Sequence, residues 1–115
     1  MMDEINEMTE ALAGAVRRSA QYERFRAARE RADSNETTRA LLAEYSRLRT
    51  RAQAEAVAGR EDKGSLERLQ KLGELLQMDP DASEYLIAEF MLSDLVGGVY
   101  RRIARAAELD LSMLE

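Results

Sequence analysis

Residues 78–107 read MDPDASEYLIAEFMLSDLVGGVYRRIARAA and decide the fold of this chain. They open on a helix start signal, because Asp79 is a favoured N-cap residue and Pro80 suits the first helical position. Asp81 adds negative charge beside the positive end of the helix dipole. Beyond this start, only Gly97-Gly98 interrupts the helix-forming pattern. The stretch therefore predicts one long helix that begins at Pro80.

This helix is apolar around most of its girth. Every fourth position is apolar along the row Ile87, Met91, Leu95, Val99 and Ile103. A helix with so much apolar surface has to be covered on several sides, and the rest of the chain covers only part of it. We therefore predict self-association. Gly97-Gly98 costs about 2 kcal/mol of helix propensity relative to two alanines, which favours a close helix approach there over a kink.

The residues predicted to mediate self-association lie mostly in this helix. They are Leu92, Leu95, Val96 and Val99, with Leu41, Tyr45 and Leu48 as core or as a secondary interface. Monomer core and subunit interface require the same residue types, so the pattern leaves both open for the second group.

Four further helices are predicted upstream, each from an apolar stripe at spacings of three and four. The stripes are Ile5, Met8, Leu12 and Val16; Tyr22, Phe25, Ala28 and Ala32; Leu41, Tyr45, Leu48 and Ala52; and Leu66, Leu69, Leu72 and Leu76. Ser19 marks a break between the first two helices. The sequence predicts an all-α fold: an antiparallel bundle of about five helices, two of them long, that self-associates.

The helix ends carry their own signals. The third helix is expected to run from Glu36 to Ala58, where Gly59 suits the left-handed position that ends a helix. Its N-cap is Asp33, Ser34 or Asn35. Ser65 is expected to cap the fourth helix. Residues 1–115 are expected to form a single domain, with a frayed tail over 108–115.

Composition excludes several kinds of chemistry. The chain has no cysteine and no histidine, so no disulfide, thiolate nucleophile or usual zinc site forms within it. The sequence indicates no catalytic, cofactor-binding or metal-binding residue, and we predict that the protein is not an enzyme. No apolar run approaches the roughly 20 residues of a membrane span. The acidic start is unlike a signal peptide, so we expect a cytoplasmic protein.

Charge is uneven along the chain, although the net charge is −5. Residues 1–16 carry four acids and no base, whereas residues 17–31 carry six Arg against two Glu. Such segments suit each other across an interface. The simpler interpretation is that each helix has a charged outer face.

The order of stripes resembles the YlbF/YmcA family of small helical bacterial proteins, and its YheA-like members in particular. The resemblance extends from about Ile5 to Ala107. Its most distinctive segment is Met78-Asp79-Pro80-x-x-x-x-Tyr85-Leu86-x-Ala88-Glu89-x-x-Leu92-x-x-Leu95. The other segments are Leu12-x-x-x-Val16-x-x-Ser19-x-x-Tyr22-x-x-Phe25 and Ala40-Leu41-Leu42-x-x-Tyr45-x-x-Leu48.

This resemblance implies a helical, self-associating regulator. Some members of the family form a complex that partners a membrane-bound endoribonuclease and influences mRNA maturation, competence, sporulation and biofilm formation. Those members bind iron–sulfur clusters through cysteines, which this chain lacks, so no cofactor is carried over.

The sequence leaves three functions open. The first is a non-enzymatic regulator or adaptor that acts by protein–protein contact, with itself, an endoribonuclease or family paralogues as partners. The second is an RNA-binding accessory factor that uses Arg17, Arg18, Arg24, Arg29 and Arg47, although nucleic-acid binding usually comes with a basic chain. The third is a free-standing homo-oligomer.

Overall fold

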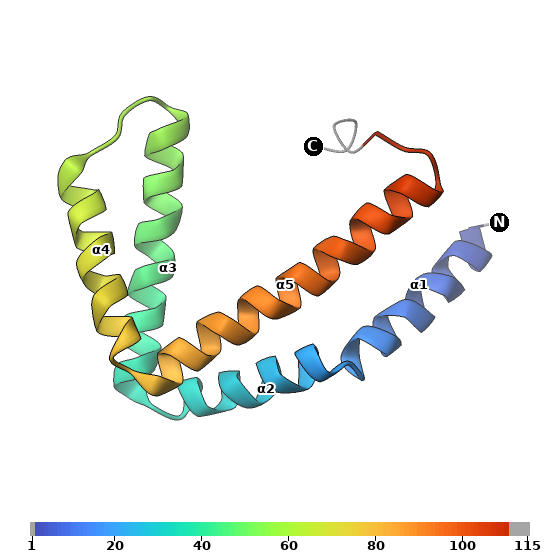
Figure 1. Ribbon diagram of the computed structural model, residues 1–115, viewed down its shortest axis with the longest axis horizontal. Coiled ribbons are helices and arrows are strands. Elements are labelled where there is room, and N and C mark those ends of the chain that lie inside the picture. The colour runs from blue at the N-terminus through green and yellow to red at the C-terminus, as the bar shows by residue number, and fades with distance from the viewer. Residues whose placement is uncertain (1, 111–115) are drawn as a thin grey trace. The chain divides into compact units, whose positions relative to one another are not determined.

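The computed structural model describes residues 2–110, and their side chains from residue 3 onward (Figure 1). The described residues form helices and loops, without a strand. The helices are α1 (Met2–Arg17), α2 (Ala20–Asp33), α3 (Glu36–Val57), α4 (Lys63–Gln77) and α5 (Pro80–Ala106). The predicted all-α fold of five helices is confirmed. Of the predicted tail, residues 111–115 lie outside the described residues.

The break between α1 and α2 falls at Ser19, as predicted. The Ser19 hydroxyl donates a hydrogen bond of 2.6 Å to the carbonyl of Val16, and the backbone N–H of Tyr22 donates to the same hydroxyl oxygen at 3.1 Å. One side chain therefore ends the first helix and caps the second, which is the usual use of a serine at a helix start.

The ends of α3 follow from its flanking residues. Of the three candidate caps, Asn35 is the one used, and its side-chain oxygen accepts from the backbone N–H of Thr38 at 3.2 Å. At the other end Gly59 has a φ of 70°, and the N–H of Arg60 reaches back to the carbonyl of Glu55 at 2.7 Å. This is a Schellman ending, which needs the left-handed glycine.

The prediction that Ser65 caps α4 is wrong. The N-cap is Asp62, whose carboxylate accepts from the backbone N–H of Gly64 at 3.0 Å. Ser65 lies one turn inside the helix, is buried, and donates its hydroxyl to Asp62 at 3.2 Å. Asp and Ser cap almost equally well, so the residue type alone does not decide between them.

The chain divides into two compact units. Unit 1 consists of residues 1–27 and 87–115, and unit 2 of residues 28–86. The expectation of a single domain stays a prediction. In unit 2 the helix pair that packs most extensively is α3 with α4, which run side by side and antiparallel (Figure 1). Within unit 2, the short α4 is therefore the main neighbour of α3.

Unit 2 has a leucine core. Leu48, Leu72 and Leu76 are buried together with Ala82, and a shell of half-buried side chains packs against them. The shell consists of Leu41, Leu42, Tyr45, Leu69 and Leu86. The buried leucines of this core all belong to the apolar stripes and Ala82 to the first turn of α5, so burial here follows the helical spacing of the sequence.

A buried polar contact joins the start of α5 to α3. The Thr38 hydroxyl, fully buried in the first turn of α3, donates a hydrogen bond of 2.6 Å to Asp79 Oδ2. The other carboxylate oxygen of Asp79 accepts from the backbone N–H groups of Asp81 and Ala82, at 3.0 and 3.2 Å. The predicted cap of α5 is therefore confirmed, and it also satisfies a buried hydroxyl of another helix.

This contact makes stability depend on pH. The hydrogen bond from Thr38, helped by the backbone N–H groups of Ala82 and Asp81 and opposed by burial, holds the pKa of Asp79 below its ordinary value. A carboxyl with a lowered folded-state pKa stabilises the fold above its unfolded pKa of about 3.9, and this contribution is lost as the pH falls through the folded pKa.

We therefore expect Asp79→Asn to lower the free energy of unfolding by a constant amount between about pH 5 and 8. The difference from the unsubstituted protein should shrink below about pH 4, where Asp79 becomes protonated in the unfolded chain before it does in the folded protein. Urea unfolding of both proteins at several pH values measures it. A difference that is as large at pH 3 as at pH 7 would contradict this role of Asp79.

Candidate protein interaction surface

Unit 1 has little buried apolar core. Among its described residues, the apolar side chains that are fully buried are two alanines, Ala88 and Ala104. The large apolar side chains of α5 in this unit are half-buried or exposed. Unit 1 thus keeps much apolar surface that a folded monomer would ordinarily bury.

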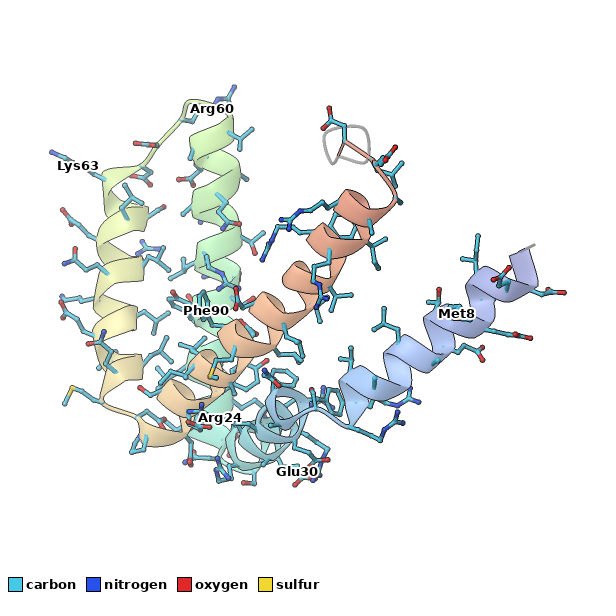
Figure 2. The ribbon with its side chains drawn as sticks, turned by 45° about the vertical axis from the view of Figure 1, so that its right-hand side comes forward. Met8, Arg24, Glu30, Arg60, Lys63 and Phe90 are labelled. Atoms are coloured by element: carbon cyan, nitrogen blue, oxygen red, sulfur yellow. The ribbon has the colours of Figure 1, made fainter. Side chains whose placement is uncertain are left out.

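The exposed apolar side chains of α5 lie on two flanks of the helix. One flank carries Val96, Tyr100 and Ile103, at spacings of four and three, each about half exposed. The other flank carries Ile87, Phe90 and Met91. Met91 is partly covered, because Nη1 of Arg24 donates to its sulfur at 3.0 Å. Figure 2 labels Phe90, which belongs to α5, and Arg24, which belongs to α2.

The apolar stripe of α1 is exposed as well. Ile5 is 61% and Met8 66% exposed, and Leu12 is also exposed. Figure 2 shows Met8 among the side chains that project from α1. These three residues line a shallow groove of about 360 Å³ together with Ile103 of α5. Within unit 1, then, the stripe of α1 meets Ile103 of the α5 flank in one groove, which Glu4 and Thr9 also line.

The predicted self-association residues of α5 divide by burial. Leu92, Leu95 and Val99 are half-buried within their unit, whereas Val96 is 49% exposed. The atoms nearest to a Cβ built on Gly98 belong to Arg101 of the same helix. The close helix approach expected at the glycine pair is therefore not made by another described helix.

The second predicted group lies in unit 2. Leu48 is buried in the leucine core, and Leu41 and Tyr45 pack against that core. Leu41 also lines a groove with Leu72 of α4, and the guanidinium of Arg49 lies over the Tyr45 ring at 5.6 Å from its centroid. Of the two roles left open by the sequence, the core role accounts for Leu48 fully. A role of this group in self-association stays a prediction.

Sequence reasoning identified the stripe of α1 but did not assign it to a surface. Ile5, Met8 and Leu12 have the same spacing as the stripes that become core in unit 2. The available signal was the composition around them, because α1 has no aromatic side chain and four acids. A helix with four acids and no aromatic side chain offers little to a core.

The arginines proposed for RNA binding do not form one patch within either unit. Arg17, Arg18 and Arg24 belong to unit 1, and Arg29 and Arg47 to unit 2. Arg47 forms an ion pair with Glu44 of the same helix at 2.6 Å, and the pKa of Glu44 is lowered by that hydrogen bond. This ion pair partly neutralises the charge of Arg47, which makes Arg47 less available to bind a phosphate.

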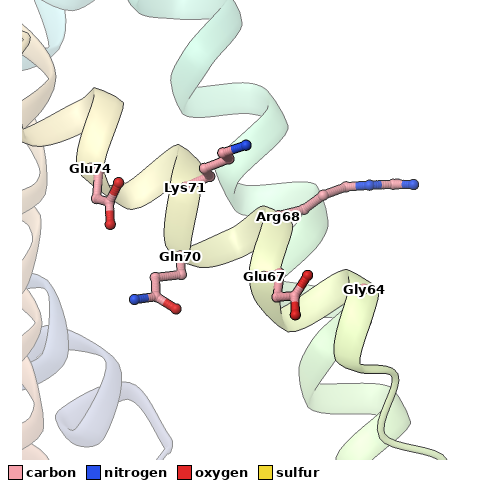
Figure 3. A pocket seen from close by; sticks show the side chains of 6 residues that line it. All are labelled: Gly64, Glu67, Arg68, Gln70, Lys71 and Glu74. Atoms are coloured by element: carbon pink, nitrogen blue, oxygen red, sulfur yellow. The ribbon is translucent and has the colours of Figure 1, made fainter.

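The described residues show no arrangement of side chains that is typical of a catalytic site. No group of three or more carboxylates, His or Cys is placed to hold a metal ion. A depression on unit 2 is lined by Gly64, Glu67, Arg68, Gln70, Lys71 and Glu74. All six come from α4, and Figure 3 shows that their charged side chains point in different directions instead of converging. No described helix is long and apolar enough to cross a membrane.

The sequence model of the family described as "Control of competence regulator ComK, YlbF/YmcA" matches residues 5–108. The chain belongs to the YlbF/YmcA family. The match extends over α1 to α5, so both units of this YlbF/YmcA protein are part of the family's domain. It confirms the resemblance that rested on the segments around Pro80 and Tyr45. The description of this family links it to control of a competence regulator.

Curated relatives of this YlbF/YmcA protein are similar over nearly their whole length. A UPF0342 protein of Symbiobacterium thermophilum, STH1710, is 33% identical over 102 residues, which is 88% of this chain and 91% of that protein. A UPF0342 protein of Caldicellulosiruptor saccharolyticus is 27% identical over 97% of this chain and 94% of that protein. A third, from Halothermothrix orenii, is 23% identical over 92% of this chain and 91% of that protein.

Proposed function

We propose that this YlbF/YmcA protein is a non-enzymatic regulator that acts by protein–protein contact. The observation that carries the proposal is the exposed apolar surface of unit 1, formed by Val96, Tyr100 and Ile103 of α5 with the stripe of α1. Contiguous exposed apolar surface marks interaction sites in soluble proteins. The family description, which names the control of another regulator, agrees with such a role.

The partners that we propose are of two kinds. The first is a further copy of this chain, in a homodimer or a higher oligomer. The second is another protein, such as an endoribonuclease or a family paralogue, whose helix lies against the remaining apolar flank of α5. The regulated process would then be mRNA processing, competence or biofilm control in the cytoplasm.

Val96→Arg tests the surface. The side chain is half exposed, so the substitution places a charge on the surface without burying it in the unit. We expect the variant to stay folded and to have a lower average mass in solution than the unsubstituted protein. A desolvated charge should weaken self-association at least about tenfold. Val57→Arg is the matched control, because Val57 is 91% exposed on unit 2. A folded Val96→Arg variant with unchanged mass would show that Val96 is not part of the interface.

Capture from the host's own lysate tests the regulatory role. The tagged protein and its Val96→Arg and Val57→Arg variants are captured after nuclease treatment, and the recovered proteins are identified by mass spectrometry. We expect the unsubstituted protein and the Val57→Arg variant to retain an endoribonuclease or a paralogue that the Val96→Arg variant loses. Recovery of the chain alone in all three experiments would contradict the adaptor role, and recovery that depends on intact RNA would favour the RNA-binding alternative.

A further inference from the structure

The apolar stripe of α1 is exposed, which leaves this helix with little packing to stabilise it. The helix has 16 residues, just above the roughly 12–15 residues below which an isolated helix is marginally stable in water. Helices in proteins gain most of their stability by packing an apolar face, yet Ile5, Met8 and Leu12 remain exposed. A partner that covers this stripe would therefore stabilise the helix.

We propose that the stripe of α1 packs against the same stripe of a second copy of this chain, with the two α1 helices antiparallel. The proposal rests on the self-association proposed above. It adds the helix that pairs, the direction of the pairing and the residues that meet.

Heptad spacing gives the register of this pair. Ile5 and Leu12 are seven residues apart and occupy the first core position of two heptads, while Met8 and Ala15 occupy the second. In an antiparallel pair, a first core position of one helix faces a second core position of the other. Leu12 of each copy then lies opposite Met8 of the other copy. Ile5 lies opposite the small Ala15, toward both ends of the contact.

Charge complementarity on one flank of the stripe supports the same register. Three residues on this flank are also seven apart: Glu4, Ala11 and Arg18. Glu4 and Ala11 immediately precede the core residues Ile5 and Leu12. The antiparallel register places Glu4 of each copy beside Arg18 of the other copy, and the two Ala11 residues beside the two-fold axis. Arg18 follows the helical path closely enough, because its N–H still donates to the carbonyl of Gly14 at 3.2 Å.

Both charged groups are available for this pairing. Glu4 and Arg18 are exposed, and neither takes part in an ion pair formed by the described residues. Two Glu4–Arg18 pairs across the symmetry axis would use charges that the single chain leaves in solvent. Ion pairs of this exposed kind contribute mainly direction and register.

The opposite direction is disfavoured by the same charges. A parallel pair would bring together the acidic halves of the two helices, with Asp3, Glu4, Glu7 and Glu10 of each copy side by side. The antiparallel pair separates these halves and sets each near the positive charges of Arg17 and Arg18. It also aligns the two helix dipoles favourably.

The groove beside α1 provides a second wall for the added helix. Ile103 of α5 faces it together with Ile5, Met8 and Leu12. A helix in this position is thus bounded on one side by α1 and on the other by Ile103 of α5. A methionine is suited to fill such a groove, because its unbranched side chain adapts to irregular gaps.

A charge exchange between two variants tests the register. Glu4→Arg and Arg18→Glu each place like charges at both ends of the antiparallel pair, so each variant alone should self-associate about tenfold more weakly than the unsubstituted protein. An equimolar mixture of the two should recover association as a mixed dimer, because both ends then pair opposite charges. Native mass spectrometry distinguishes mixed from like dimers if one variant is isotopically labelled. A statistical distribution of dimers in the mixture would overturn the antiparallel register.

A second substitution tests the stripe itself. Met8→Glu should weaken self-association at least a hundredfold, because it buries an unpaired carboxylate on both sides of the axis. Val57→Glu makes the same change at an exposed site of unit 2 and should have no effect. Circular dichroism checks that both variants stay helical. If Val96→Arg dissociates the protein while Met8→Glu does not, the assignment to α1 is overturned and the proposed function stands. If the unsubstituted protein is a monomer of 13.0 kDa, both self-association proposals fail.

Discussion

Leu76→Ala should lower the free energy of unfolding by about 3 kcal/mol, within the 2–5 kcal/mol typical of a buried leucine. Leu76 is 1% exposed and lies in the core of unit 2, in contact with the cluster of Leu48, Leu72 and Ala82. The substitution removes three side-chain carbons and leaves a cavity among helices that can collapse only in part. The loss is large beside the total stability expected of a small protein, about 5–15 kcal/mol.

Leu75→Ala is the matched control for this effect. Leu75 precedes Leu76 in the same helix but is 52% exposed, so its truncation should cost less than about 1 kcal/mol. Urea unfolding followed by circular dichroism gives both values. Equal losses in the two variants would contradict the packing of unit 2 described above, because the direction in which α4 faces α3 would then be wrong.

Asp79→Ala should also cost about 3 kcal/mol, for a different reason. It removes the N-cap of α5, which contributes about 0.5–2 kcal/mol. It also leaves the fully buried hydroxyl of Thr38 without its acceptor, at a further cost of about 1–3 kcal/mol. Asp94→Ala, an exposed change inside the same helix, should stay within about 0.5 kcal/mol.

A double-mutant cycle separates the two parts of this effect. Thr38→Val removes the hydroxyl and keeps the volume, and Asp79→Ala in that background loses only the cap. The coupling free energy between the two sites should be about 1–2 kcal/mol. Additive losses in urea unfolding would show that the 2.6 Å contact between Thr38 and Asp79 adds no stability of its own.

The ends of the helices show how far local sequence determines this fold. Pro80 with Asp79 predicted the start of α5, and Gly59 predicted the end of α3, because each residue acts on the backbone within a few positions. The hydroxyl that binds Asp79 was not predictable, since Thr38 lies 41 residues away. The choice of Asp62 over Ser65 was not predictable either, because both residue types cap helices well.

The interaction surface was only partly predictable, because spacing reveals a stripe but not what covers it. Leu48 and Val96 both lie on apolar rows, yet one is core and the other is half exposed. Leu92, Leu95 and Val99 were predicted as interface and are half-buried within unit 1. The stripe of α1 was identified as helical but was not assigned to a surface, since its pattern matches that of a core helix.

Sedimentation equilibrium of the unsubstituted protein over a wide concentration range tests the central claim most directly. That claim is that the apolar surface of unit 1 is an interface between protein chains, in the first place between copies of this one. We predict a mass of at least twice the 13.0 kDa of the single chain, which falls toward 13.0 kDa on dilution. A mass of 13.0 kDa at every concentration, with the helices intact by circular dichroism, would contradict it.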